Sequence, residues 1–474
     1  MSQQFLLSFK KDVSLIEAEE TKQLVVQSSN CSLTFKQVQS GLKTALKTLA
    51  DGGANLAQLS QMVQQDDGNF LALRFYTYLQ KFSNFGWLCH SVLAEGKAIA
   101  IAIPMTSDYQ FSYTEVAVES KYVLSRFAYS HQVEEQLLLE SPLSQTQVLL
   151  MDWKGAALLS QLAKPHSCQE LVSGIPGISL ETVKQFVNLL LSAQMLCEVC
   201  EDGTIQEQAN VTLAQWEFHD LLFHTRSRPR KYANPSEGTY RFLGKIEPLP
   251  ALKPRMSEEV IELYKPDLET LKTTDASFTQ VLEARKSIRE YGETPLSAQQ
   301  LGEFLYRTAR IKHILKTERG EISRCPYPSG GALHELELYP VVNSCQGIPS
   351  GLYHYHPLAH QLYRISDRTE TVEALLKDAR QSMGQQSMPQ VLIVIAARFQ
   401  RLAWKYESMA YALMLKNVGV IYQTMYLVAT AMELAPCGLG GGNSDLFTKA
   451  TGCNYYAETS VGEFALGSQP KTKH

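Results

Sequence analysis

The sequence predicts a multidomain protein of mixed helix and sheet, with two small repeated modules followed by a larger α+β or α/β domain. Three observations support this prediction. A faint internal repeat covers residues 1–205, a stretch rich in Pro, Arg and Lys covers 206–275, and helical and strand-like runs alternate over 276–474. At 474 residues the chain is long enough for about three domains.

The repeat begins with two similar strand-like segments, FLLSFKKDV at 5–13 and YVLSRFAYSHQV at 122–133. Each copy continues with a second apolar run, KQLVVQSS or TQVLLMDW, and then with helical segments. Each ends on an amphipathic helix that leads into a short Leu-Cys strand, which begins at Leu88 in one copy and Leu196 in the other. This order predicts two winged-helix-like modules.

The two modules are expected at residues 1–110 and 111–205, with a connecting arm at 206–275. Winged helices often bind DNA, but the candidate recognition helix LETVKQFVNLLLSAQ at 180–194 has a single Lys, and the chain has a net charge of −4. No nucleic-acid partner is therefore expected. An exposed strand edge that accepts an extended peptide is one alternative. A purely structural N-terminal half is equally compatible with so diverged a repeat.

The composition predicts a soluble cytoplasmic protein. Hydrophobic residues make up 45% of the chain and charged residues 19%, and nine cysteines, an odd number, do not suggest a disulfide framework. The N-terminus lacks the pattern of a signal peptide. The apolar run at 418–436 is interrupted by polar residues from Gln423 to Glu433, so a buried helix is expected rather than a membrane span.

Arg285, Ser287 and Arg289 occupy every second position of LEARKSIREYG, just after a predicted helix end. If the chain is extended there, all three side chains project to one side. Two guanidinium groups and a hydroxyl are well suited to hold a phosphate, because arginine offers paired donors to phosphate oxygens. A solvated charged turn, with Glu283 and Glu290 as ion-pair partners, is the alternative.

A loop of small residues, Pro328, Ser329, Gly330 and Gly331, is followed at once by a strand-like run in RCPYPSGGALHELELYPVV. A loop without bulky side chains allows a large flat ligand to lie against the backbone. An ordinary turn before a strand is the simpler alternative.

Apolar residues at helical spacing from Tyr411 to Met425 predict a long buried helix. Lys405 and Tyr406 stand just before it. A partly buried lysine beside a phenol is a candidate proton-transfer pair, because desolvation lowers the pKa of the amine. An exposed lysine next to a core tyrosine is the commoner arrangement.

The glycine-rich run Gly438, Leu439, Gly440 and Gly441 is expected to close this helix. Its spacing resembles a dinucleotide-binding loop, but such a loop follows a strand and opens a helix. Because the expected order is the reverse, a Rossmann site is rejected.

No metal site is predicted. Cys197 and Cys200 form a lone CxxC without a second pair nearby, so structural cysteines are favoured. His354 and His356 are expected on one face of a strand, but no carboxylate is expected to join them.

Taken in order, ARKSIREY, YPSGGALHELELYPVV, GLYHYHP and GLGGG resemble the FMN-dependent nitroreductase superfamily. More closely, they resemble SagB-type azoline dehydrogenases that act on ribosomally made peptides, with cyanobactin oxidases as the nearest group. WEFHDLLFHTRSR at 216–228 is similar to the opening stretch of that subfamily, and Lys405-Tyr406 to its Lys-Tyr pair. The resemblance covers residues 214–470.

The resemblance implies an α+β, nitroreductase-like domain that binds FMN at the interface of a homodimer, preceded by two peptide-recognition modules that bind a leader sequence. It also implies a role for each candidate residue. The FMN phosphate and ribityl chain would contact Arg285, Ser287 and Arg289, and the flavin ring would lie along Pro328, Ser329, Gly330 and Gly331. The loop Gly438–Gly441 would reach the flavin from elsewhere in the dimer. Lys405 and Tyr406 would form the catalytic pair.

The implied reaction oxidises thiazoline or oxazoline rings of a precursor peptide to thiazole or oxazole. One hydrogen leaves as a proton to Lys405, Tyr406 or both, and the other as hydride to flavin N5, with dioxygen as final acceptor. Two alternatives stay open: a generic nitro- or quinone-reducing enzyme that uses nicotinamide, and a peptide-binding scaffold with a vestigial flavin site. Which peptide is used, whether a leader is needed and which ring is preferred are also open.

Overall fold

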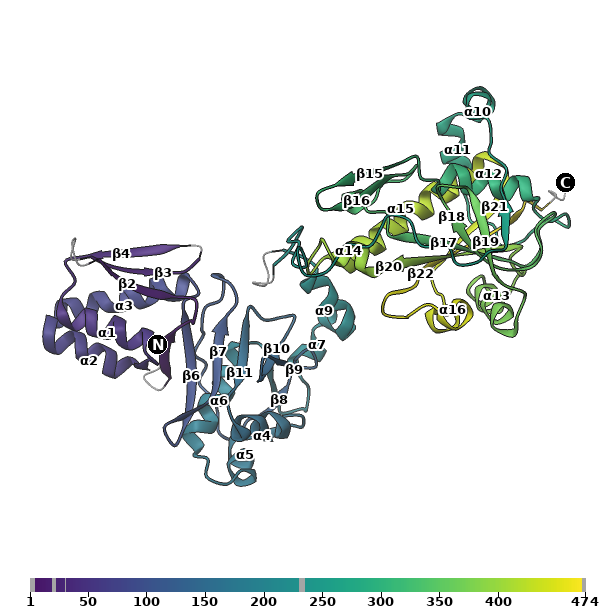
Figure 1. Cartoon of the computed structure of the whole chain (residues 1–474). Helices are drawn as coiled ribbons and strands as arrows, with labels where there is room; N and C mark the ends of the chain where they lie inside the picture. The colour runs from purple at the N-terminus through teal and green to yellow at the C-terminus, as the bar shows by residue number, and fades with distance from the viewer. Residues whose placement is uncertain (1–4, 19–22, 30, 230–234, 471–474) are drawn as a thin grey trace. The chain divides into compact units, whose positions relative to one another are not determined.

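The computed structural model divides the chain into two compact units, Met1–Asn234 and Pro235–His474 (Figure 1). The structure describes residues 5–18, 23–29, 31–229 and 235–470. The expected connecting arm, 206–275, is divided between the two units. Its first part therefore belongs with the repeated modules and its remainder with the C-terminal domain.

The N-terminal unit contains one series of elements twice. Each copy has a strand, three further strands, a helix, a two-residue strand, two helices and a closing strand, so the predicted internal repeat is confirmed. The first copy contains β1 (Leu6–Phe9), β2 (Ser14–Ala18), β3 (Gln23–Gln27), β4 (Ser32–Lys36), α1 (Ser40–Ala50), β5 (Ala54–Asn55), α2 (Leu56–Asp67), α3 (Asn69–Asn84) and β6 (Leu88–Ala94), and continues into β7 (Lys97–Pro104). The second contains β8 (Lys121–Leu124), β9 (Tyr129–Val133), β10 (Gln136–Glu140), β11 (Thr146–Leu150), α4 (Trp153–Gln161), β12 (His166–Ser167), α5 (Cys168–Gly174), α6 (Leu180–Ser192) and β13 (Leu196–Val199).

Both copies begin their second helix in the same way. Asn55 before α2 and Ser167 before α5 each accept a hydrogen bond from the backbone N–H of the third helical residue. The side chains of those residues, Gln58 and Glu170, accept in return from the backbone N–H of the cap. Such reciprocal caps satisfy backbone donors that a helix start leaves free, so the local sequence sets this boundary in both modules.

The two copies share one antiparallel sheet. Its seven strands run in the order β5-β1-β6-β7-β11-β10-β9, and β7 of the first copy pairs with β11 of the second. Three-stranded sheets, β2-β3-β4 and β12-β8-β13, belong to one copy each. The helices α7 (Gln206–Ala209), α8 (Val211–Ala214) and α9 (Phe218–Arg226) follow, and Arg226 forms an ion pair of 2.6 Å with Glu140 of β10.

The C-terminal unit is built on a second seven-stranded antiparallel sheet, in the order β14-β19-β18-β17-β20-β22-β21. Its strands are β14 (Val260–Glu262), β17 (Leu336–Val342), β18 (Gly351–His356), β19 (Gln361–Ser366), β20 (Val391–Arg398), β21 (Leu434–Leu439) and β22 (Glu458–Ser468), and a separate hairpin joins β15 (His313–Thr317) to β16 (Gly320–Arg324). Its helices are α10 (Leu268–Thr274), α11 (Phe278–Ala284), α12 (Ala298–Ala309), α13 (Glu370–Ser382), α14 (Phe399–Ala403), α15 (Ala410–Ala431) and α16 (Ser444–Thr451).

Helices cover both faces of this sheet. In β20, Ile393 packs with α12 and α15 on one face, whereas the neighbouring Val394 packs with α13 and α16 on the other. Side chains alternate along a strand, so a continuous apolar run such as VLIVIAA fits a strand that is buried on both faces. The mixed α+β fold expected for the C-terminal domain is confirmed.

The glycine-rich run does not close the long helix, so that prediction was wrong. Helix α15 ends at Ala431, and Gly438 and Leu439 belong to the intervening strand β21. The buried residues of β21 pair with β22, and Pro436 is tolerated because β21 is an edge strand. The loop thus follows a strand and precedes α16, but the sheet is antiparallel, which separates it from a dinucleotide-binding fold.

Within the described ranges, no helix is long and apolar enough to cross a membrane. The apolar run at 418–436 forms most of α15 and then β21. Its buried side chains, among them Val418, Ile421 and Met425, belong to the core between α15 and the sheet.

Candidate active site

The alternating row of Arg285, Ser287 and Arg289 begins where α11 ends and is not helical. The Ser287 hydroxyl lies 2.7 Å from the Tyr426 hydroxyl, and the Arg285 guanidinium carbon lies 5.2 Å from the centre of the Tyr426 ring. The backbone N–H of Ile288 donates to a carbonyl of β21 at 2.8 Å. These contacts hold the row beside β21 and the C-terminal part of α15.

The first part of the glycine-rich run lies at the same place. The backbone N–H of Gly438 donates to the Tyr426 hydroxyl at 2.7 Å, so one phenol joins this strand to the row. Burial raises the pKa of the neighbouring Cys437 thiol, and Arg289, which forms a hydrogen bond with it, opposes this shift. Gly440 and Gly441 are exposed. The row and the run therefore form one group, which we call the phosphate-side group.

A buried carboxyl group lies beneath the glycine-rich loop. Burial raises the pKa of Glu463 to about 7, and the negative charge of Asp378 adds to this rise. The Ser460 hydroxyl donates a hydrogen bond to the carboxylate and lowers the pKa by a smaller amount. A Cβ atom at Gly442 would lie 2.0 Å from the Glu463 carboxyl carbon, so a larger residue there would have to displace this carboxyl group. Glu463 was not identified from the sequence, where it is one acidic residue in an apolar run.

The loop that precedes β17 is held by two buried polar side chains. The Ser329 hydroxyl donates to Glu335 at 3.1 Å and accepts from the Asn417 amide at 3.1 Å. Asn417 also donates to Glu335 at 2.9 Å and accepts from the Gly330 backbone N–H at 3.2 Å. Ser329 thus fixes the loop, whereas Pro328 is exposed.

Glu335 and Asn417, which hold the loop of the candidate site, were missed by the sequence reasoning. Burial raises the pKa of Glu335, although its bonds to Asn417 and Ser329 lower it in part. Each could have been noticed in the sequence, although only weakly. Glu335 is a charged residue at the start of a buried strand, and Asn417 is an amide inside an apolar helix. Such polar residues in a core usually have a partner, but the sequence does not say that they are partners of each other.

Lys405 and Tyr406 meet at the backbone of Gly331. A Cβ atom at Gly331 would lie 2.6 Å from both the Lys405 amine and the Tyr406 hydroxyl. Gly331 also has a φ of 64°, in the left-handed region that favours glycine. The structure therefore brings the predicted pair and the predicted loop together, and we call them the ring-side group.

Within one chain, the two groups lie on opposite sides of α15. The ring-side loop contacts Asn417 and the phosphate-side row contacts Tyr426, nine residues further along the helix. Nine residues correspond to about two and a half turns and about 13 Å of rise. The loop and the row therefore contact different turns and different faces of α15.

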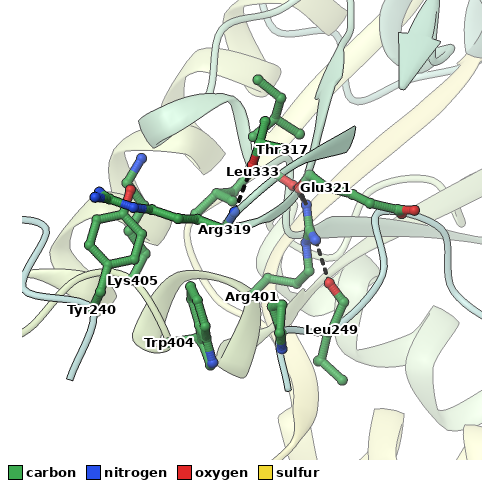
Figure 2. Close-up of a pocket in the computed structure, with 11 residues that line it drawn as sticks. Tyr240, Leu249, Thr317, Arg319, Glu321, Leu333, Arg401, Trp404 and Lys405 are labelled. Atoms are coloured by element: carbon green, nitrogen blue, oxygen red, sulfur yellow. Dashed lines mark hydrogen bonds between the residues drawn. The ribbon is translucent and has the colours of Figure 1, made fainter. Parts of the chain in front are cut away.

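A cavity of about 40 Å³ lies beside Lys405 and is also lined by Tyr240, Arg319 and Arg401 (Figure 2). Arg401 is buried, and its guanidinium donates to the backbone carbonyls of Leu249 at 2.6 Å, of Glu321 at 3.1 Å and of Leu333. These carbonyls belong to three separate segments. Burial, together with the nearby Arg398, lowers the pKa of Arg401 to about 10.

The expectation that no carboxylate joins the histidines of β18 was wrong. His354 forms a 2.9 Å bond with Glu337, which also pairs with Arg398 at 3.3 Å. Glu337 lies on β17, next to β18 in the sheet, so strand pairing brings the groups together. In the part of the chain that the structure describes, no three His, Cys, Asp or Glu side chains are placed to hold a metal ion.

Comparison with known proteins assigns three parts of the chain. The profile described as "Nitroreductase family" matches residues 282–468, "Cyanobactin oxidase ThcOx" matches 122–233, and "ThcOx helix turn helix domain" matches 1–113. The resemblance expected from the sequence motifs is thereby confirmed.

Three curated relatives match part of the chain. A protein named as a nitroreductase in Methanocaldococcus jannaschii is 30% identical over 182 residues, which are 38% of this chain and 85% of that protein. The trifolitoxin-processing protein TfxB of Rhizobium leguminosarum is 31% identical over 27% of this chain and 35% of its own length. The microcin B17-processing protein McbC of Escherichia coli is 25% identical over 45% of this chain and 75% of its own length.

Two solved structures are similar at low scores. A nitroreductase-named structure from Ralstonia eutropha has a TM-score of 0.36 and 22% identity, and the match covers 50% of this chain and 98% of that one. The Escherichia coli microcin synthetase McbBCD complex with truncated pro-MccB17 has a TM-score of 0.33 and 18% identity, over 52% of this chain and 90% of that one.

Proposed function

The chain belongs to the nitroreductase family, and we propose that it is an FMN-dependent oxidase of thiazoline or oxazoline rings in a ribosomally made precursor peptide. The observation that carries this proposal is the meeting of the Lys405 amine and the Tyr406 hydroxyl at Gly331. It places a candidate base beside a loop without bulky side chains. The matches of the N-terminal unit to a cyanobactin oxidase and to its helix-turn-helix domain support the peptide substrate.

The residues present fit FMN. The phosphate-side group offers the guanidinium groups of Arg285 and Arg289 and the hydroxyl of Ser287, a donor set that suits a phosphate. The ring-side group offers a loop in which Gly330 and Gly331 carry no side chain, with the Lys405 amine and the Tyr406 hydroxyl beside Gly331. Bound FMN supplies the two-electron redox chemistry that side chains lack. Dioxygen as final electron acceptor is part of the proposal.

A second copy of the chain would complete the site. The two groups lie on opposite sides of α15 in one chain, so the loop of a partner would have to face the row of the first. Apolar side chains are exposed on α11 and α15, and a partner seated there would remove them from water. They are Phe278 (69% exposed), Leu282 (42%), Tyr411 (46%) and Leu415 (40%). We therefore propose a homodimer.

The proposed reaction makes the azoline ring aromatic by removing two hydrogens from adjacent ring carbons. One hydrogen leaves as a proton, which the amine of Lys405, the Tyr406 oxygen, or both accept, and the other leaves with the electron pair as hydride, which FMN would take up when bound. Ser329, Asn417 and Glu335 hold the neighbouring loop rigid, which keeps the substrate ring in one orientation toward the base.

Peptide recognition is assigned to the N-terminal unit. Among the described strands, β2 and β4 are the edges of the first module's three-stranded sheet. The β2 edge is tied to α1, because Glu17 forms ion pairs of 2.7 Å with Lys43 and 2.6 Å with Lys47. We propose that an extended peptide adds to one edge of this sheet as a further strand.

The test is mass spectrometry of an azoline-containing peptide after incubation with the flavin-loaded protein. We expect a loss of two hydrogens per ring, and Lys405→Ala is expected to lower the rate by about a hundredfold or more. Lys377→Ala, on the exposed surface of α13, is the matched control and should retain full activity. An unchanged peptide mass, together with rapid reduction of the flavin by nicotinamide, would favour a generic reductase instead.

A further inference from the structure

A segment of the arm runs antiparallel to the Lys405-Tyr406 pair. Glu237 and Glu407 form an antiparallel bridge, and the backbone N–H of Tyr240 donates to the Lys405 carbonyl at 3.2 Å. This segment lies between residues 234 and 281, which none of the three family profiles matches. The segment therefore adds side chains to the site that the family comparisons do not assign.

Tyr240 brings its ring against the lysine. The Lys405 amine lies 5.7 Å from the centre of the Tyr240 ring, and the guanidinium carbon of Arg319, at the turn of the β15–β16 hairpin, lies 4.5 Å from it (Figure 2). The ring of Trp404 meets Tyr240 edge-on at 5.8 Å. Two separate segments, the stretch with Trp404 and Lys405 and the hairpin turn with Arg319, thus hold this phenol in one place.

Two cations face the Tyr240 hydroxyl. Burial raises the pKa of this phenol, but hydrogen bonds to Arg319 and Lys405 and the positive charges of both outweigh burial, so the pKa is lowered. The other charged groups nearby already have partners. Arg241 pairs with Glu407, Glu321 accepts from the Ala251 backbone N–H, and Arg401 donates to three carbonyls.

We propose that Tyr240 is a positioning residue for Lys405: with Arg319, it holds the lysine amine beside Gly331 and accepts a hydrogen bond from the charged form of that amine. This inference rests on the proposed role of Lys405 as a base. It assigns no chemical step to Tyr240, which acts through the lysine. Arg319 in turn acts through Tyr240 and through its own charge.

The first experiment does not depend on flavin or on activity. Tyrosinate formation is followed by ultraviolet absorbance in the wild type and in Tyr240→Phe. The difference between the two titration curves isolates this one phenol among 22 tyrosines. We expect it to titrate below the ordinary value of 10.0, and Arg319→Gln to raise its midpoint by about one pH unit. Tyr264→Phe, an exposed tyrosine of the same arm, is the matched control and should leave the titration of Tyr240 unchanged.

The second experiment measures the pH dependence of azoline oxidation, where the rate rises as the lysine loses its proton. Tyr240→Phe removes an acceptor for the ammonium, so the midpoint of the rise should move to lower pH. Arg319→Gln removes a like charge, so the midpoint should move to higher pH, each by about one unit. Tyr240→Phe should also lower kcat by about tenfold, because the amine is held less firmly, with KM for the peptide unchanged.

Opposite displacements of the two variants support the inference, because a purely structural role would not move the midpoints in opposite directions. Midpoints that stay unchanged in both variants overturn it, as does an ordinary titration of Tyr240 that Arg319→Gln leaves unchanged. If the tyrosinate titration behaves as expected but no azoline peptide is oxidised, the contact between Tyr240 and Arg319 stands and the proposed function fails by itself.

Discussion

The carboxyl group of Glu463 couples the glycine-rich loop to pH. It is 8% exposed and keeps its proton to about pH 7, whereas an unburied glutamate ionises near 4.5. The folded state therefore binds a proton that the unfolded chain has already lost between these values. The stability from this group is fully present below pH 4.5 and is lost as pH rises through 7.

Glu463→Gln should remove this dependence, because an amide keeps the hydrogen bond with Ser460 and carries no charge to bury. At pH 8 the free energy of unfolding should rise by about 3 kcal/mol relative to the wild type. At pH 4.5 the two proteins should differ little. Denaturant unfolding at both pH values checks this, with Glu269→Gln on the exposed surface of α10 as control. An equal effect at both pH values would mean that packing, rather than charge, decides the result.

At the scale of the element, the non-helical stretch after α11 presents its side chains alternately. The Ser287–Tyr426 contact and the backbone bond of Ile288 fix its path along β21. Arg285 and Arg289 then belong to the same side as Ser287, and Lys286 to the other. An element without regular hydrogen bonding of its own is thus held by a neighbouring helix and strand.

Arg285→Ala and Arg289→Ala should each weaken FMN binding by about tenfold or more, because a hydrogen bond to a charged group contributes about 1.5–3 kcal/mol. Fluorescence titration of FMN measures the loss, and an unchanged unfolding midpoint shows that the fold persists. Lys286→Ala is the matched control, since it removes a positive charge from the opposite side of the same stretch. An equal loss of FMN affinity in all three variants would mean that overall positive charge, rather than specific phosphate contacts, explains the effect. Undiminished FMN binding in the two arginine variants would refute the phosphate assignment.

At the scale of the whole molecule, the proposed site needs two chains. The phosphate-side and ring-side groups lie on opposite sides of α15, and this helix also carries exposed Tyr411 and Leu415. A partner seated on this surface would cover the apolar side chains and bring its loop toward the first chain's row. Flavin binding and dimerisation should therefore depend on each other.

Leu415→Glu should shift the protein from dimer to monomer, because it places a charge in the proposed apolar contact. FMN affinity should fall by at least about tenfold with the loss of the partner's loop. Sedimentation equilibrium gives the mass, and flavin titration gives the affinity. Phe70→Glu changes a 77% exposed apolar residue of the N-terminal unit and should alter neither. A wild-type monomer that binds FMN stoichiometrically would contradict the proposed dimer.

Local patterns in the sequence predicted several elements of both units. The spaced apolar residues from Tyr411 onward form α15, and the Leu-Cys pairs begin β6 and β13 in the two repeats. The glycine-rich run was placed wrongly, because the short apolar stretch before it continues a helical pattern equally well. Its pairing with β22 decides that it is a strand.

The sequence by itself determined the residue types that the chemistry needs, because a phosphate-binding row, a bare loop and a lysine-tyrosine pair each consist of neighbours along the chain. Only the tertiary structure decided which of them meet. Gly331 reaches Lys405 and Tyr406, Asn417 reaches Glu335, and Tyr240 reaches Arg319, although more than seventy residues separate each pair. Such contacts depend on sheet register and helix packing, which local periodicity does not encode.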